Sequence, residues 1–253
     1  MGNINWVAPI VIGAVLVSGC GSGTSTGDSR PAGTVPATAA PTAGTAASDQ
    51  TSATGVLFED PFDDDRNGWG VIDHPDFGSA LFDGGDYVWN FRGSLGHLLP
   101  AVLGEQYDRG ELEMADVVVH ADATVLRGGG VIGVFCRETP DDDAEWEWYE
   151  FVARDGYAAI RRADTEGNIE PLAETRDIEL PAGEQVTIDA TCASDSEGGA
   201  QLSLALNAAS PQLEVTTDDP LGTGPPGLQA WTFPIHDEMD IRWHGFSISS
   251  PES

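Results

Sequence analysis

Apolar and polar residues alternate with a period of two in many short segments from residue 56 onward, and Gly, Asp, Asn and Pro separate these segments. Almost no stretch shows the 3.6-residue period of an amphipathic helix. Successive side chains of a strand point to opposite faces, so the pattern is typical of half-buried strands. It predicts strands over residues 86–91, 111–120, 131–137, 146–153, 157–162, 185–192, 201–207 and 239–249.

Two of these segments show which face turns inward, because their alternate residues are all apolar. They carry Val186, Ile188 and Ala190 in one segment and Leu202, Leu204 and Leu206 in the other. Tight turns are predicted at Asp155-Gly156 and at residues 197–199, where glycine suits a hairpin. Antiparallel strands in this number predict an all-β, two-sheet jelly-roll sandwich. We expect its core to contain Trp69, Trp89, Trp231 and Trp243.

A short apolar run near the amino terminus ends in Val17-Ser18-Gly19-Cys20. The run covers residues 6–17, shorter than the roughly 20 that a membrane-spanning helix needs, and fits the core of a signal peptide. Two small residues before a cysteine resemble the site at which bacterial lipoproteins are cleaved and lipidated. The resemblance implies a leader over residues 1–19, a lipid on Cys20 and an extracytoplasmic, membrane-anchored location. No Lys or Arg precedes the run, so an ordinary cleaved secretory signal and a retained anchor stay open.

The segment after Cys20 has the composition of a tether. From Gly21 to Gly55, 30 of 35 residues are Gly, Ser, Thr, Ala or Pro and none is aromatic, so it cannot bury enough apolar surface to fold. We therefore expect a disordered linker over residues 20–55 and a single sandwich domain over residues 56–253.

The chain is strongly acidic, with 42 Asp and Glu against 11 basic residues, all of them Arg, and a net charge of −31. Such a field repels phosphate backbones and anionic lipid headgroups. We expect no nucleic-acid partner, and membrane attachment only through the lipid.

With Cys20 assigned to lipid, Cys136 and Cys192 remain. Two such cysteines outside the cytoplasm usually form a disulfide. Cys136 shares strand parity with Val134, and Cys192 with Ala190, which places both thiols on the core face. We predict a disulfide between them.

Several short motifs resemble concanavalin A-like sandwich domains of the laminin-G-like and family 16 glycosidase-like kinds, which often occur on bacterial lipoproteins. They are residues 58–62 with Gly68-Trp69, then 133–137, 149–151, 155–157, 204–207, 227–228 and 246–248. The resemblance spans residues 56–249 and describes sheet architecture more than chemistry. It implies a sandwich that binds polysaccharide or protein, or that hydrolyses glycans.

Residues 145–150 read Glu-Trp-Glu-Trp-Tyr-Glu, and glycosidases need two carboxylates that flank the scissile bond. Family 16 enzymes carry Glu-x-Asp-x-x-Glu on a strand. The resemblance thus implies Glu145 and Glu150 as a catalytic pair, with Glu147 in place of the middle Asp. Residues five positions apart in a regular strand point to opposite faces, so this pair requires a β-bulge. The alternative is a solvated acidic face.

The same segment also suggests a sugar-binding surface. If Tyr149 and Phe151 pack inward, Trp146, Trp148 and Glu150 share the other face. Tryptophan rings stack on sugars, and a carboxylate accepts hydrogen bonds from hydroxyl groups. We predict that Trp146, Trp148 and Glu150 bind ligand; the alternative is that the tryptophans cover the second sheet or lie under a loop.

Two acidic runs supply loop-borne oxygen atoms, residues 63–65 with Asn67 and residues 141–143. Calcium takes six to eight oxygen ligands, and sandwich domains often use it to hold a loop. A structural Ca²⁺ is therefore expected at Asp63, Asp65 and Asn67, although acidic loops are common in so acidic a chain. We expect no other cofactor.

These observations favour a lipid-anchored, extracytoplasmic binding module whose ligand is a polysaccharide or envelope glycan and which is not catalytic. Two alternatives stay open: a glycoside hydrolase that uses the glutamates of residues 145–150, and an envelope protein-interaction module.

Overall fold

The computed structural model describes residues 55–75, 78–92, 94–98, 114–140, 146–207, 210–232 and 238–251. Cys20, the leader and residues 20–54 of the linker lie outside this part of the chain. So do Glu145 and the acidic run 141–143.

The described residues form fifteen strands, and neighbouring strands pair antiparallel. The strands are β1 (Val56–Asp60), β2 (Ile72–His74), β3 (Gly78–Asp83), β4 (Asp86–Arg92), β5 (Ser94–Leu98), β6 (Val117–Arg127), β7 (Val131–Pro140), β8 (Trp146–Arg154), β9 (Tyr157–Asp164), β10 (Ile169–Thr175), β11 (Gln185–Ser194), β12 (Ala200–Leu206), β13 (Leu213–Thr217), β14 (Gly227–Trp231) and β15 (Glu238–Ser249). Within these ranges, no helix is long and apolar enough to cross a membrane.

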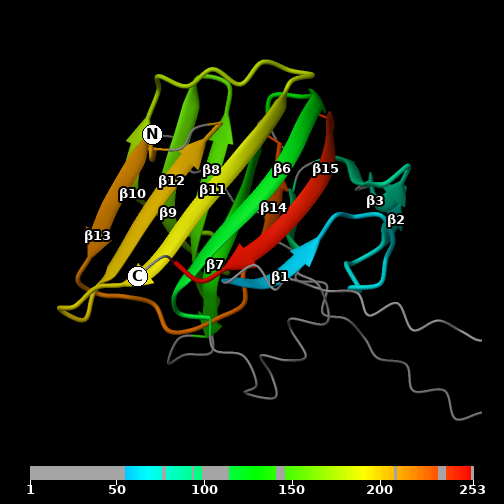
Figure 1. Cartoon of the computed structure of the whole chain (residues 1–253). Coiled ribbons are helices and arrows are strands. Elements are labelled where there is room, and N and C mark those ends of the chain that lie inside the picture. Colours follow the sequence, from blue (N-terminus) through cyan, green and yellow to red (C-terminus); the bar gives the residue numbers. More distant parts are fainter. Residues whose placement is uncertain are drawn as a thin grey trace, which may run out of the picture. The chain divides into compact units, whose positions relative to one another are not determined.

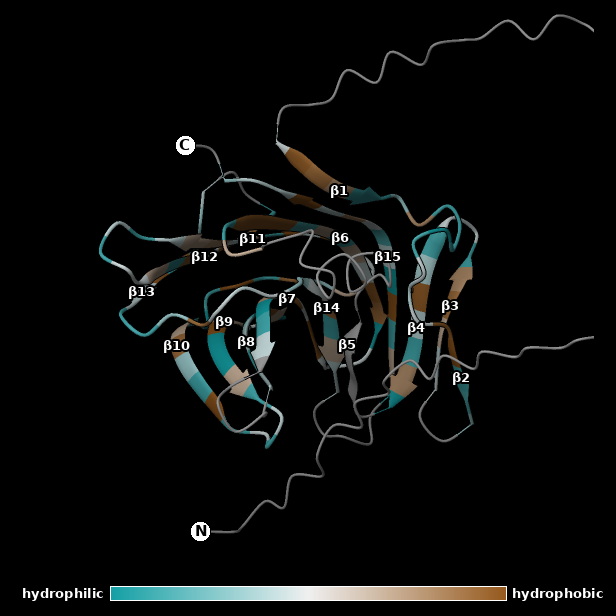
Figure 2. Ribbon diagram, turned by 90° about the horizontal axis from the view of Figure 1, so that it is seen from below, coloured by the Kyte–Doolittle hydropathy of each residue, from teal (hydrophilic) through white to brown (hydrophobic). Residues whose placement is uncertain are grey.

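The strands make two sheets. The nine-stranded sheet has the order β13-β12-β11-β6-β15-β4-β3-β2, with β1 also paired to β15, and the six-stranded sheet has the order β10-β9-β8-β7-β14-β5. Figure 2 shows that both sheets curve in the same sense and that the smaller one lies inside the curve of the larger. The predicted all-β, two-sheet jelly-roll sandwich is thereby confirmed (Figure 1).

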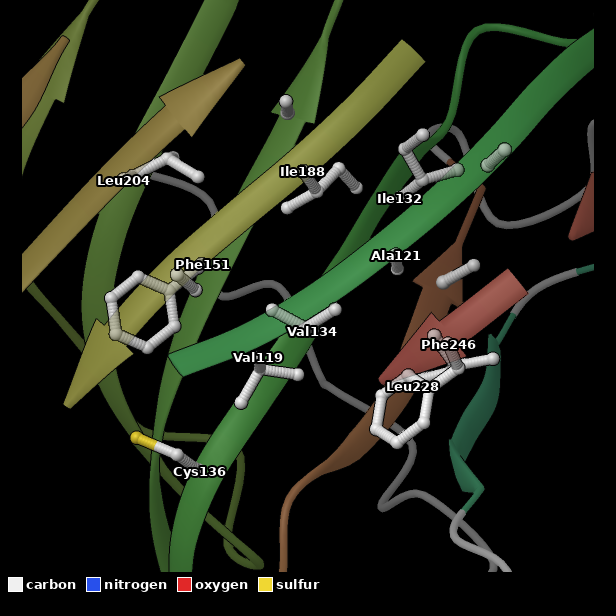
Figure 3. Close-up of a cluster of buried hydrophobic side chains, with 14 of the residues drawn as sticks. Val119, Ala121, Ile132, Val134, Cys136, Phe151, Ile188, Leu204, Leu228 and Phe246 are labelled. Atoms are coloured by element: carbon white, nitrogen blue, oxygen red, sulfur yellow. The ribbon is translucent and has the colours of Figure 1, made fainter. Parts of the chain in front are cut away.

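The core lies between the two sheets, where alternate residues of both meet (Figure 3). The residues at alternating positions of 186–190 and 202–206 all turn into it, as predicted. Cys136 of β7 and Cys192 of β11 form the predicted disulfide, which joins one sheet to the other. Burial of the alternate apolar residues is what holds the sheets face to face.

The first strand ends in a buried polar turn. The Asp60 carboxylate, 1% exposed, accepts hydrogen bonds from the Phe62 N–H at 2.8 Å, the Trp69 Nε1–H at 2.7 Å and the Asn67 amide at 2.8 Å. Phe62 has a φ of 58°, and the bond from its N–H to Asp60, two residues earlier, is the Asx-turn that stabilises such backbone. The rings of Phe62 and Trp69 then meet at 5.3 Å between centroids.

Candidate functional site

The six-stranded sheet presents its other side away from the nine-stranded sheet, and we call this side the concave face (Figure 2). Strand alternation decides which residues occupy it. Tyr149 and Phe151 of β8 belong to the core, so Trp148 and Glu150 point to the concave face. The shared face expected for these two residues is therefore present.

Two small apolar clusters lie on the concave face. One contains Phe135, Trp148 and Ala163, and the other contains Val131, Val152 and Ala159 with the rings of Tyr157 and Trp231 against them. These clusters are buried and make an apolar layer separate from the main core.

An ion pair crosses the concave face on adjacent strands. Glu150 of β8 lies directly opposite Arg161 of β9, and their Oε1 and Nε atoms are 2.5 Å apart. The two side chains are only 4% and 11% exposed, so the charges attract each other with little screening by water. The Glu150 carboxylate is thus already neutralised by a neighbouring cation.

Arg161 also contacts an aromatic ring from a third strand. Its Cζ atom lies 4.7 Å from the centroid of Trp231 in β14, a cation–π distance. Trp231 is half-buried and belongs to the concave-face cluster, so the prediction that it packs in the main core is wrong. Glu150, Arg161 and Trp231 together form a fixed polar and aromatic row on this face.

Trp146, at the start of β8, is the exposed member of the predicted binding set. Counted over the whole residue, Trp146 is 40% exposed, whereas Trp148 is 7% and Glu150 is 3% exposed. Trp146 is held through its backbone, whose carbonyl accepts a hydrogen bond from the N–H of Thr165. Of the three residues, Trp146 offers the ring that a ligand in solvent can reach, and the ligand roles of all three stay predictions.

The carboxylates of Glu147 and Glu150 do not lie on the same face of β8, so they cannot flank one glycosidic bond. Residues 147–154 of β8 pair with β9 without a shift, so side chains three positions apart point to opposite faces. Glu147 pairs with Arg162 at 2.7 Å and Glu150 pairs with Arg161, each glutamate on its own face. Retaining glycosidases need carboxylates only about 5 to 5.5 Å apart on one side of the sugar. The Glu145 to Glu150 pair lies partly outside the described residues.

Two of the three side chains named for calcium have other partners. Asp63 pairs with Arg66 at 2.6 Å, and the Asn67 amide donates to Asp60. Across the described part of the chain, no group of three or more His, Cys, Asp or Glu side chains is arranged to hold a metal ion. The calcium site at Asp63, Asp65 and Asn67 stays a prediction.

One histidine on the outer face of the nine-stranded sheet is hydrogen-bonded to a carboxylate. His120 of β6 bonds through Nδ1 to Asp189 of β11 at 2.7 Å, and its Nε2 lies 3.4 Å from Asp122. The hydrogen bond to Asp189 raises the pKa of His120 above its ordinary value, because the carboxylates favour the imidazolium.

This raised pKa links stability to pH. The stabilisation is complete below the unfolded pKa of about 6.5 and disappears as the pH rises through the higher folded pKa. We therefore expect the native chain to gain stability from about pH 9 to about pH 6, and His120→Gln to gain less. Urea midpoints at both pH values measure this, with Asp189→Asn as the matched variant. An equal pH response of native chain and variants would contradict the link.

A scan against models of protein families finds no match for this chain, and a search of curated proteins finds none. Solved structures do match. A carbohydrate-binding module, CBM66 from Bacillus subtilis, superposes with a TM-score of 0.51 at 14% identity, covering 73% of this chain and 96% of its own. A Bacillus subtilis protein of unknown function with a galectin-like fold gives 0.55 at 12% identity, over 77% and 96%.

A third match is SCLam, a non-specific endo-β-1,3(4)-glucanase of family 16, co-crystallised with an oligosaccharide. It gives a TM-score of 0.54 at 10% identity and covers 79% of this chain and 96% of its own. Identities this low establish the fold alone. The domain is therefore a galectin- and concanavalin A-like β-sandwich.

Proposed function

We propose that this domain is a glycan-binding module whose ligand stacks on Trp146 at the end of the concave face, and that it binds without catalysis. Trp146 is the main observation behind the proposal, because its indole ring is exposed at the end of the concave face. The rest of that face contains aromatic side chains and an ion pair. Indole rings stack on the apolar faces of sugars, which suits an exposed ring such as that of Trp146. The likeness of the fold to a carbohydrate-binding module and to a glucanase with a bound oligosaccharide supports this class of ligand.

The polar row adds a reason to expect neutral sugars. Arg161 is paired with Glu150 and covered by Trp231, so the row carries no net charge of its own. The chain as a whole carries a charge of −31, which repels polyanionic glycans. Neutral glucans are the first probes to use.

The test is a titration of the full chain with β-1,3- and β-1,3-1,4-glucan oligosaccharides, followed by tryptophan fluorescence, after a wider glycan array. Trp146→Ala is expected to weaken binding by about tenfold, because loss of one stacking ring costs roughly 1.4 kcal/mol. Leu81→Ala removes an exposed apolar side chain from the other sheet and is expected to leave affinity unchanged. If the native chain binds no glycan on the array, while its near-ultraviolet circular dichroism shows that it is folded, the proposal is wrong.

Hydrolysis is tested in the same samples by release of reducing ends. The proposal expects none, since Glu147 and Glu150 lie on opposite faces in separate ion pairs. Release that disappears in Glu150→Gln would replace the binding module with a glycosidase that also uses Glu145.

A further inference from the structure

A cavity lies at one end of the sandwich, away from the concave face. It has a volume of about 520 Å³, within the range of small-molecule sites. Val125 of β6 and Val186 of β11 line it from the nine-stranded sheet, and Ile132 of β7 and Ala153 of β8 line it from the six-stranded sheet. The cavity therefore opens between the sheets, at the edge of the main core.

One segment, residues 176–184, closes this end, and we call it the strap. It crosses the upper end of the sandwich from β10 to β11 (Figure 1). On the six-stranded sheet, the carbonyl of Ile178 accepts a hydrogen bond from Gly156 at 2.9 Å, and Leu180 donates to Asp155 at 3.1 Å. On the nine-stranded sheet, Gly183 donates to the carbonyl of Val125 at 2.8 Å. The strap is thus fixed to both sheets, and the cavity is formed without a ligand.

The lining has two parts. Val125, Ile132 and Val186 make an aliphatic inner part, which Leu180 and Pro181 of the strap extend, and polar residues make much of the rest. Three carboxylates, Asp155, Glu179 and Glu184, also line the cavity, against the single guanidinium of Arg154. Arg154 lies 5.6 Å from the ring of Tyr157, so its charge is engaged with that ring.

We propose that this cavity binds a small organic cation with an aliphatic body, such as an alkylammonium compound. No aromatic side chain is among the described residues that line it, so it offers no ring on which a sugar can stack. An aliphatic wall takes the alkyl part, and the excess of carboxylates takes the positive group. The site is separate from the proposed glycan face and does not depend on it.

The test compares three ligands with the same six-carbon chain: hexyltrimethylammonium, 1-hexanol and hexanoate. Titration calorimetry of the full chain at low salt is expected to give binding of the cation about tenfold tighter than the alcohol, with hexanoate the weakest, since each carboxylate adds a modest attraction. The preference is expected to shrink at molar salt, because screening weakens these attractions. Equal binding of all three, or no binding of the cation, would overturn the proposal.

Two double variants test whether the carboxylates that line the cavity attract the cation. Glu179→Gln with Glu184→Gln is expected to reduce affinity for the cation about threefold to tenfold and to leave that for 1-hexanol unchanged. Glu197→Gln with Glu214→Gln makes the same change in net charge away from the cavity and is expected to keep both affinities. Equal losses in the two variants would show a general field effect and would refute a local site.

Methyl spectra and 1H–15N spectra of the native chain show where the ligand binds. The cation is expected to shift the methyl signals of Leu180 and Ala153, which line the cavity, and not the indole signal of Trp231. A shift at Trp231 alone would assign the binding to the concave face instead.

Discussion

Replacement of both Cys136 and Cys192 by alanine is expected to lower the free energy of unfolding by about 4 kcal/mol, since the disulfide closes a long loop in the unfolded chain. The two residues are 56 positions apart, both are fully buried, and the bridge ties β7 to β11 across the core. For a domain of this size the melting temperature should fall by roughly 8 to 16 °C. Urea and thermal unfolding of the oxidised native chain and the double variant measure the difference.

The native chain under reducing conditions is the matched control, because it keeps the same side chains without the crosslink. It should unfold near the midpoint of the double variant. The dependence of unfolding free energy on urea should also steepen when the crosslink is absent, since the unfolded chain then exposes more surface. A double variant within about 1 kcal/mol of the oxidised native chain would contradict the expected role of the bridge.

Substitution Asp60→Ala is expected to destabilise the domain by about 3 kcal/mol, because it leaves buried donors without an acceptor. The N–H of Phe62 and the Nε1–H of Trp69 both lose their partner, and the turn that holds Phe62 at a φ of 58° loses its bond. Urea unfolding followed by tryptophan fluorescence gives the change in free energy.

Asp60→Asn keeps an acceptor oxygen and is expected to cost less than alanine, because neutral hydrogen bonds are weaker than charged ones. Asp64→Ala is the matched control, since the Asp64 carboxylate is exposed and its partner among the described residues is the neighbouring Arg66. If Asp60→Ala unfolds at the same urea concentration as Asp64→Ala, the buried turn is not a source of stability.

The long strands could be predicted because one of their faces is buried. β11 and β15 alternate buried and partly exposed residues over ten or more positions, and their sequences show the same period. The strand predicted over 111–120 was misplaced, because β6 runs from Val117 to Arg127 and shares only residues 117–120 with it. Two of the strands that were missed give a weaker signal. β2 has only three residues, and β10 is an edge strand without a buried residue, interrupted by Pro171.

Part of the concave face could also have been found in the sequence. With the Asp155-Gly156 turn predicted, Arg154 faces Tyr157, and counting outward from the turn brings Glu150 opposite Arg161. The contact of Arg161 with Trp231 gives no such signal. It joins strands 70 positions apart in the sequence, and only the order of strands in the folded sheet brings them together.

The neighbouring residues Arg161 and Arg162 have one more consequence, because they serve opposite faces of β9. If β9 slipped by one residue along β8 in either direction, Arg161 would lie opposite Phe151 or Tyr149 and enter the core, while Ile160 would leave it. An unpaired guanidinium there costs about 3 to 5 kcal/mol. In a chain with many acids and few cations, these two adjacent arginines thus destabilise hairpins in which β8 and β9 are misaligned, and so favour the native register during folding.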